Sequence, residues 1–153
     1  MKTVIQRVSE ASVETDSISA RTIGAGLVAL AAIVTDDTAK DRDWTAQKIA
    51  HLRVFPDGEG KMNKSVLEAG GSVLLISNFT VAGDASRGRR PSFDLAMKPP
   101  QAREAFEALA ESLRGLGVPV VTGEFGVHMR VRLVNDGPVT IVLDSALARP
   151  AGA

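Results

Sequence analysis

Two hydroxyl side chains stand where an apolar segment of the chain ends. The apolar run 72–76 is followed by Ser77-Asn78-Phe79-Thr80, so Ser77 and Thr80 flank an amide and an aromatic ring. Hydroxyl groups in such a place can bind a substrate or act as nucleophiles, but a nucleophile needs an adjacent base. No histidine, lysine or carboxylate stands beside them in the sequence. Hydroxyl groups at strand ends also commonly satisfy backbone groups, so both interpretations stay open.

A second candidate for chemistry is the segment Asn135-Asp136-Gly137-Pro138. Its composition predicts a hairpin turn. The functional alternative is that Gly137 and Pro138 present backbone carbonyl groups to a site, joined by a cis peptide bond. About 5–6% of X-Pro bonds are cis in folded proteins. Composition alone therefore favours the plain turn.

Arg87-Gly88-Arg89-Arg90 is the densest basic cluster of the chain. Guanidinium groups bind phosphate through paired hydrogen bonds, so contact with a phosphate is one use for such a loop. A solvated surface loop is the other. The segment 58–61 resembles a phosphate-binding loop but lacks the spacing and the following Ser or Thr that such loops need.

Composition limits the classes of protein to which these candidates can belong. The chain has 153 residues, of which 44% are hydrophobic, and this fits one packed domain. Its 18 Lys and Arg balance 18 Asp and Glu, so we expect neither a DNA-binding nor a membrane-bound protein. Without cysteine, and with histidine only at His51 and His128, we expect no metal site and no cofactor. No apolar run reaches about 18 residues, and no secretory signal is evident, which together predict a cytoplasmic protein.

The hydrophobic pattern predicts an α+β fold with strands more numerous than helices. One helix is expected over 41–53, and a second should open at Pro99-Pro100 and stop at Gly115. The second has an apolar stripe at helical spacing, made of Ala102, Ala105, Phe106, Leu109, Ala110 and Leu113. Strands are expected at Val4–Val8, Leu27–Val34, Ser72–Ser77, Val127–Leu133 and Val139–Leu143. We expect a single domain over 1–145 and a flexible tail over 146–153.

Taken together, these segments resemble one family, the D-aminoacyl-tRNA deacylases of the bacterial and eukaryotic type. Ser77-Asn78-Phe79-Thr80-Val81 corresponds to the family motif Ser-Gln-Phe-Thr-Leu, and 135–140 to its Asn-X-Gly-Pro motif. The other matching segments, in the expected order, are Met1–Val13, Leu52–Phe55, Gly60–Ser65, Arg90–Phe93, Phe125-Gly126 and Met129. The resemblance runs from Met1 to about Leu143.

Three positions depart from the family pattern. Asn78 stands where the family usually has Gln and is one methylene shorter, so a hydrogen bond made by that Gln is lost or bridged by water. Val81 for Leu is a conservative packing change. Val127, beside His128 in the Phe-Gly-X-X-Met stretch, stands where the family often has Ala, and we expect this to alter the pocket wall slightly.

The resemblance implies a homodimer with a mixed or antiparallel β-sheet, or a partial barrel, and two main helices. It implies hydrolysis of the ester that joins a D-amino acid, or a glycine mischarged on tRNA-Ala, to tRNA, which is a proofreading step of translation. The cis Gly137-Pro138 motif of one subunit would reach into the other subunit's site and exclude L side chains. Phe125 and Met129 would line the substrate pocket.

The same resemblance places catalysis at Ser77, Asn78, Phe79 and Thr80. Thr80 is either the nucleophile or, as we favour, a backbone donor that works with Phe79. In the favoured route the ribose 2′-hydroxyl of the tRNA assists the attack, while the N–H groups of Phe79 and Thr80 stabilise the oxyanion. Neither route calls for a cofactor.

Contacts with tRNA phosphates are expected from one set of basic residues: Arg7, Arg53, Lys61, Lys64, Arg87, Arg89 and Arg90. Two other functions stay open. One is a relative with relaxed chirality that removes small L-amino acids from tRNA. The other is a dimer that binds aminoacyl-tRNA without hydrolysing it, because Asn78 replaces Gln.

Overall fold

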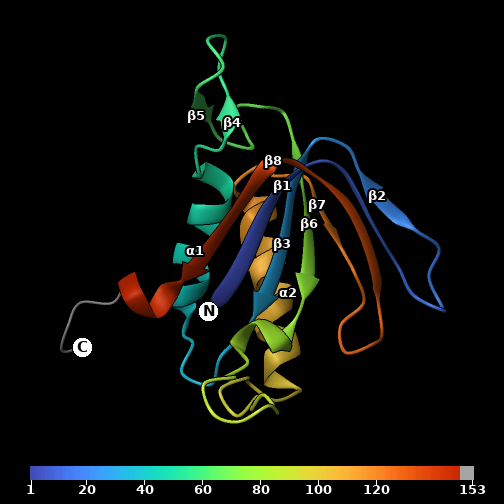
Figure 1. Cartoon of the computed structure of the whole chain (residues 1–153), viewed down its shortest axis with the longest axis vertical. Coiled ribbons are helices and arrows are strands. Elements are labelled where there is room, and N and C mark those ends of the chain that lie inside the picture. The colour runs from blue at the N-terminus through green and yellow to red at the C-terminus, as the bar shows by residue number, and fades with distance from the viewer. Residues whose placement is uncertain (149–153) are drawn as a thin grey trace.

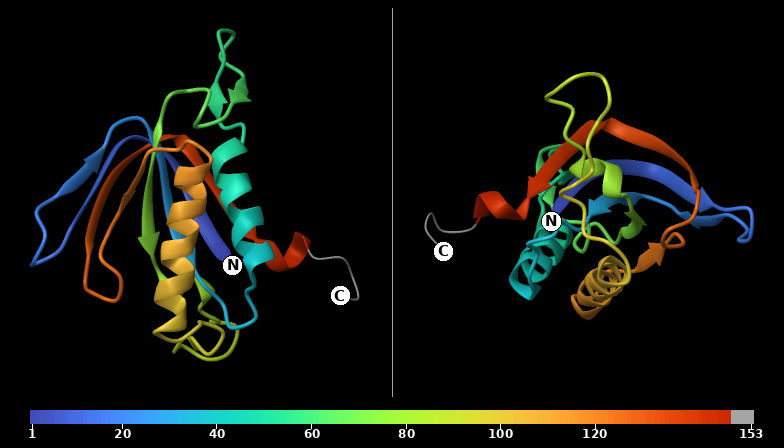
Figure 2. Two further views of the ribbon diagram at one scale, coloured as in Figure 1. Left: turned by 180° about the vertical axis from the view of Figure 1, so that it is seen from behind. Right: turned by 90° about the horizontal axis from the view of Figure 1, so that it is seen from below.

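The computed structural model describes residues 1–148 as a curved six-stranded sheet with two helices against one face (Figures 1 and 2). The helices are α1 (Ala39–His51) and α2 (Gln101–Gly115). The strands of the sheet are β1 (Lys2–Glu14), β2 (Arg21–Ile23), β3 (Gly26–Ala32), β6 (Ser72–Ser77), β7 (Val120–Thr122) and β8 (Arg130–Asp144). A small hairpin of β4 (Phe55–Pro56) and β5 (Met62–Lys64) projects from one end.

The sheet is mixed, as the predicted fold class requires. Its order is β2-β1-β3-β6-β7, and β8 pairs with β1. β1 runs antiparallel to β2, β3 and β8, while β3, β6 and β7 are parallel to one another. Two strands therefore end side by side at one edge, where Ala31 of β3 pairs with Ser77 of β6.

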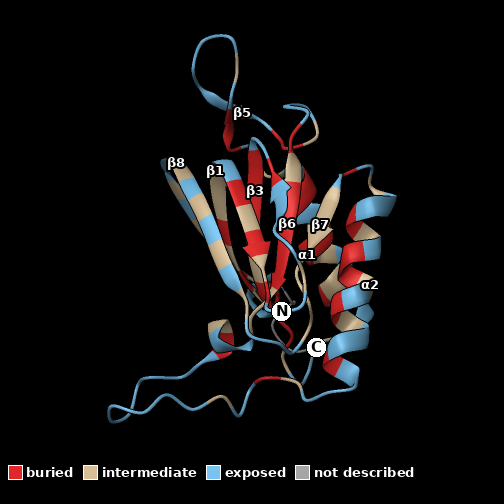
Figure 3. Cartoon of the chain, turned by 90° about the vertical axis from the view of Figure 1, so that its right-hand side faces the viewer, coloured by how far each residue is buried: buried red, intermediate tan, exposed pale blue. Residues whose placement is uncertain are grey.

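Both faces of the sheet carry apolar side chains. One face packs on the helices, where the predicted stripe of α2 is confirmed by buried Phe106, Leu109 and Leu113. The opposite face, inside the curve of the sheet, holds a second cluster that includes Val13, Leu74 and Ile76. Figure 3 shows burial concentrated on β3 and β6, while β8 carries only exposed and half-buried residues along most of its length.

The first strand is longer than the alternation predicts. β1 continues through Ser9-Glu10 to Glu14, and Ala11 and Val13 are buried again beyond the interruption. The pairing with β8 shifts register between Val8 and Glu10. A β-bulge at this point breaks the inside–outside alternation without ending the strand.

The predicted hairpin turn at 135–138 is wrong. The segment lies inside β8, where Asn135 pairs with Val8 and Thr140 pairs with Gln6, so the residues between them bulge outward and the strand keeps its direction. The two strands expected on either side are therefore one strand, which begins at Arg130. Asn, Asp, Gly and Pro suit a tight bulge as well as a turn, which explains the error.

Other boundaries differ by a few residues. α1 begins at Ala39 because Asp41 accepts a hydrogen bond from the Thr38 N–H (3.0 Å), and it ends before Leu52, whose backbone is extended. Residues 146–148 of the predicted tail belong to a short 3-10 helix, η2 (Ser145–Ala148), and the remaining five lie outside the described residues. Neither helix of the described chain is long and apolar enough to cross a bilayer.

Candidate active site

A cavity of about 670 Å³ opens where β3 and β6 end. It lies between the inner face of the sheet, the segment before α2 and the segment that leads into β8. Its wall is predominantly apolar and consists of Leu30, Ala31, Ile33, Ile76, Ser77, Asn78, Phe79, Ala96, Met97, Lys98, Pro99, Ala102, Phe125, Gly126, Val127, His128, Met129, Val131 and Leu133. An apolar cavity with a few polar groups is the usual form of a small-molecule site.

The predicted motif after β6 forms one wall of this cavity. Asn78 is fixed by its N–H, which donates to the Ala31 carbonyl (2.9 Å). The chain then turns into a short 3-10 helix, η1 (Phe79–Ala82). Ser77, Asn78 and Phe79 line the cavity, whereas Thr80 does not.

The Asn78 side chain acts as a cap on η1. Its Oδ1 accepts the Thr80 N–H (3.1 Å) and the Thr80 hydroxyl. The Thr80 N–H is therefore engaged, contrary to the expectation that it is a free oxyanion donor. The N–H of Phe79 donates to no acceptor in the described part of the chain. Of the two expected donors, the Phe79 N–H is the one left available.

The opposite wall comes from the segment between β7 and β8. Arg103 of α2 holds Phe125 by a hydrogen bond to its carbonyl (3.2 Å) and by its guanidinium, 5.0 Å from the ring centroid. The Phe106 ring lies 6.0 Å from that of Phe125. Met129 fits because position 123 is glycine, where a Cβ atom would stand 2.4 Å from the Met129 sulfur.

Gly137 and Pro138 do not line the cavity of their own chain. Both are exposed, and the peptide bond between them is cis. Asn135 closes the bulge on itself, because its Oδ1 accepts the Val139 N–H (2.8 Å). A side chain at 137 would meet the Val139 nitrogen at 2.5 Å, so the bulge requires glycine there.

Arg7 fastens this bulge to the rest of the chain. Its Nε donates to the Asp136 carbonyl (2.8 Å) and its Nη1 to the Val54 carbonyl (2.6 Å). Only 12% of the side chain is exposed. We therefore place Arg7 with the bulge rather than among the residues that contact phosphate.

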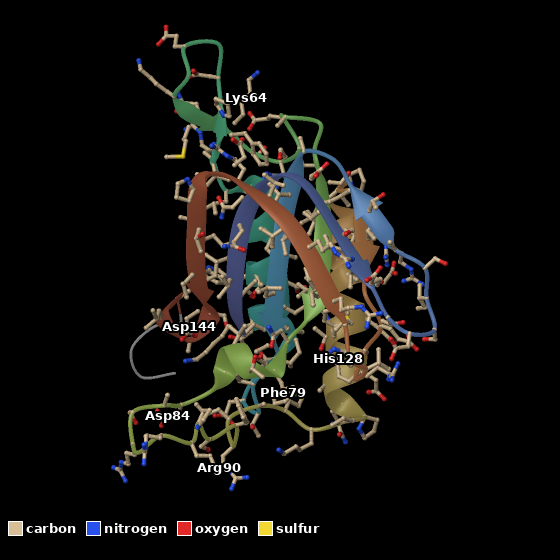
Figure 4. The ribbon with its side chains drawn as sticks, turned by 45° about the vertical axis from the view of Figure 1, so that its right-hand side comes forward. Lys64, Phe79, Asp84, Arg90, His128 and Asp144 are labelled. Carbon is tan, nitrogen blue, oxygen red and sulfur yellow. The ribbon has the colours of Figure 1, made fainter. Side chains whose placement is uncertain are left out.

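The other predicted phosphate contacts fall at two opposite ends of the molecule. Arg53 bonds to Asn63 (2.7 Å) and Lys61 pairs with Glu59 (2.8 Å) in or next to the β4–β5 hairpin. Lys64 belongs to this end, whereas Arg90 lies at the far end, near Phe79 (Figure 4). The hairpin is held by Asp57, whose pKa is lowered by the Asn63 side chain and by backbone N–H groups of Lys61 and Glu59.

Sequence patterns did not reveal the contribution of the segment before α2. Lys98, Met97 and Ala96 line the cavity because the Met97 N–H donates to the Ile33 carbonyl (3.0 Å), which brings this segment against the end of β3. The one local signal was the Pro99-Pro100 pair that opens α2. Within residues 1–148, no three His, Cys, Asp or Glu side chains cluster closely enough to hold a metal ion.

Comparison with solved structures shows the fold class of the protein. The solved structure of "a probable eukaryotic D-amino acid tRNA deacylase" aligns with a TM-score of 0.82 over 93% of this chain and 97% of that one. At 14% identity, this likeness shows a shared fold. The structure of a "c-Myc DNA Unwinding Element Binding Protein" is 39% identical, with a TM-score of 0.90 over 99% and 100% of the two chains.

Sequence relatives identify the family. The family described as D-Tyr-tRNA(Tyr) deacylase matches residues 4–144. The D-aminoacyl-tRNA deacylase of Thermomicrobium roseum is 52% identical over 97% of both chains, and that of Geobacter sulfurreducens is 48% identical over 95% of both. The chain belongs to the D-aminoacyl-tRNA deacylase family, a family of hydrolases, and the resemblance in the sequence motifs is confirmed.

Proposed function

We propose that this protein hydrolyses the ester of D-aminoacyl-tRNA to a free D-amino acid and tRNA, in the cytoplasm, where tRNA is charged. The observation that carries the proposal is the apolar cavity at the end of β6, with the unengaged N–H of Phe79 beside it. A cavity of this kind suits an amino acid attached to the end of a larger molecule. Two relatives that are 52% and 48% identical to this chain over nearly its whole length are named D-aminoacyl-tRNA deacylases.

The chemistry rests on positioning rather than on a general base. In the proposed route the ribose 2′-hydroxyl assists the attack of water on the ester carbonyl, and the Phe79 N–H donates to the oxyanion. The bond from the carbonyl carbon to the ribose oxygen then breaks, and that oxygen leaves, protonated, as a hydroxyl group of the tRNA. The Thr80 hydroxyl donates to Asn78, and Thr80 stands outside the cavity wall, which disfavours it as the nucleophile. Asn78 keeps η1 in shape, so it is a positioning residue.

We propose that two copies of the chain complete each site. Gly137 and Pro138 are exposed and lie away from their own cavity, as expected of a motif that enters a partner's cavity. Among the described strands, β8 pairs with β1 alone, and it exposes Val134 (51%) and Val142 (71%), which suits burial against a second copy. The motif's backbone would exclude an L side chain and accept glycine, so glycyl-tRNA is a further substrate.

The test is hydrolysis of matched D- and L-aminoacyl-tRNA carrying one amino acid, followed by glycyl-tRNA. Cleavage of the D form and of the glycyl ester, with the L form intact, is expected. Cleavage of both enantiomers would refute chiral selection, and cleavage of neither by a folded dimer would leave a binding protein. Sedimentation of the purified chain tests the dimer independently, and a monomer that retains D-selectivity would refute the cross-subunit arrangement.

A further inference from the structure

A second, smaller cavity of about 450 Å³ adjoins the candidate active site. Lys98 lines both cavities. Phe79 of the first wall packs edge-on against Phe93 of the second, with ring centroids 5.2 Å apart and planes at 82°. The second cavity is completed by Arg90, Pro91, Ser92 and Asp94. The two cavities are thus neighbours, joined by Lys98 and by the contact between the Phe79 and Phe93 rings.

The loop that carries the arginines is fixed at its base. Asp84 and Ser92 exchange two backbone hydrogen bonds of 2.8 Å each, which close the loop between them. The Asp84 carboxylate accepts the Ser86 N–H (2.8 Å), and Asp94 accepts the Ser92 hydroxyl (2.7 Å). Arg90 is therefore held next to the second cavity by the closed base of its loop.

Two cations line the second cavity, Arg90 and Lys98, and two more, Arg87 and Arg89, belong to the same loop as Arg90. Arg87, Arg89, Arg90 and Lys98 are exposed, and their side chains make no ion pair or hydrogen bond with any described residue. Elsewhere, surface cations are commonly paired, as Arg114 is with Glu111 at 2.6 Å. The carboxylates of Asp84 and Asp94 lie in the same loop region, so the four cations outnumber the two anions.

We propose that Lys98 and the second cavity bind the phosphodiester and the nucleotide that precede the terminal nucleoside of the substrate. This inference rests on the proposed function. An ester held in the first cavity puts the terminal ribose at its opening, and in this proposal the strand leaves past Lys98, the residue that lines both cavities. Unpaired cations next to aromatic rings are the usual surface for a single-stranded nucleic acid. Lys98 is the contact for the last phosphate, and Arg90 follows it along the strand.

Two substrates isolate the phosphate contact. One is D-aminoacyl-tRNA, and the other is the same amino acid esterified to adenosine, which has no phosphate. We expect Lys98→Gln to lower kcat/KM on the tRNA by about tenfold more than on the adenosine ester, as for loss of one charge-assisted contact that only the tRNA can make. Lys98→Arg should restore most of the loss. Lys48→Gln is the matched control, since Lys48 is an exposed lysine of α1 that lines neither cavity.

Salt dependence gives a second measurement that does not require cleavage of the short ester. Each phosphate contact to a single strand contributes about 0.7 to the slope of log affinity against log salt. Lys98→Gln should reduce that slope for D-aminoacyl-tRNA by about this amount, and Lys48→Gln should leave it unchanged.

The outcomes separate the two proposals. A loss of kcat/KM in Lys98→Gln that is confined to the tRNA substrate, together with a smaller slope of log affinity against log salt, supports the inference. Equal losses on both substrates would overturn it and make Lys98 part of the ester site, and a Lys98 variant that behaves like the Lys48 variant would overturn it as well. A wild-type protein that cleaves neither substrate would instead refute the proposed function itself.

Discussion

Replacing Arg7 with alanine removes the fastening of the Gly137-Pro138 bulge. The guanidinium donates to the carbonyls of Val54 and Asp136. A hydrogen bond to a charged group contributes about 1.5–3 kcal/mol. Val54 is buried, so in Arg7→Ala its carbonyl is left without a partner and nearly the whole contribution of that hydrogen bond to stability is lost. Asp136 is exposed, so water replaces the guanidinium at its carbonyl. The ion pair with the 60%-exposed Asp136 carboxylate adds less than about 1 kcal/mol.

The sum predicts that Arg7→Ala lowers the free energy of unfolding by about 2–4 kcal/mol. For a chain of this size, about 2–4 °C in Tm accompanies each kcal/mol, so Tm should fall by about 5–15 °C. Arg7→Lys should recover less than half, because one ammonium group cannot reproduce the two directed hydrogen bonds. Urea and thermal unfolding followed by circular dichroism measure both variants.

Arg42→Ala is the control, because Arg42, within residues 1–148, forms an ion pair with its exposed neighbour Asp43 alone, and its loss should change the free energy of unfolding by less than about 0.5 kcal/mol. If Arg7→Ala is no less stable than Arg42→Ala, the structural role assigned to Arg7 is wrong. The D-to-L ratio of hydrolysis rates should also fall in Arg7→Ala, since a loosened bulge excludes L side chains less strictly. An unchanged ratio in a folded variant would separate the bulge from chiral selection.

Three further predictions concern other parts of the chain. Thr80→Ala should keep kcat within about tenfold of the wild type, because its hydroxyl is bound to the Asn78 side chain and Thr80 itself does not line the cavity; a loss beyond roughly 10³-fold would indicate a nucleophile or an essential donor. Gly26→Ala should abolish the soluble fold, because its Cβ would stand 2.0 Å from the Ser72 carbonyl oxygen, and normal expression would contradict this packing. The pKa of Glu14 is lowered by hydrogen bonds from Arg130 first and then Arg132, so its contribution to stability is present above pH 4.5 and lost as pH falls below it. Glu14→Gln should flatten the acid limb of Tm against pH, and superimposable curves would refute the assignment.

The hydrophobic pattern of consecutive residues was sufficient to predict those helices and strands whose pattern is not interrupted by their pairing with distant segments. The apolar stripe of α2 and the apolar run of β6 are properties of consecutive residues, so the sequence predicts both closely. The bulge in β8 was missed because its composition also suits a turn. Only the pairing of Asn135 with Val8 and of Thr140 with Gln6 distinguishes them, and that pairing joins residues more than a hundred positions apart.

The site was predicted unevenly for the same reason. Polar residues at the end of a buried strand pointed to the 77–80 motif, and the cavity is there. The direction of the Asn78 side chain could not be predicted, because it depends on the short turn of η1. The position of Lys98 in the cavity wall depends on the contact of its segment with the end of β3, which no spacing in the sequence indicates.

The composition of the cavity wall explains how such a site can work without a general base. Among the described residues that line it, Lys98 and His128 alone have ionisable side chains, and both are exposed. An activated ester needs little more than correct placement and an oxyanion donor. Backbone groups supply both in this proposal: the N–H of Phe79 for catalysis and the carbonyls near Gly137 for selection. In this proposal activity survives a side-chain change such as Asn78 for Gln when the backbone around Phe79 and Gly137 keeps its conformation. The residues that hold this backbone, Arg7 and Asn78, therefore matter more for activity than any single reactive side chain.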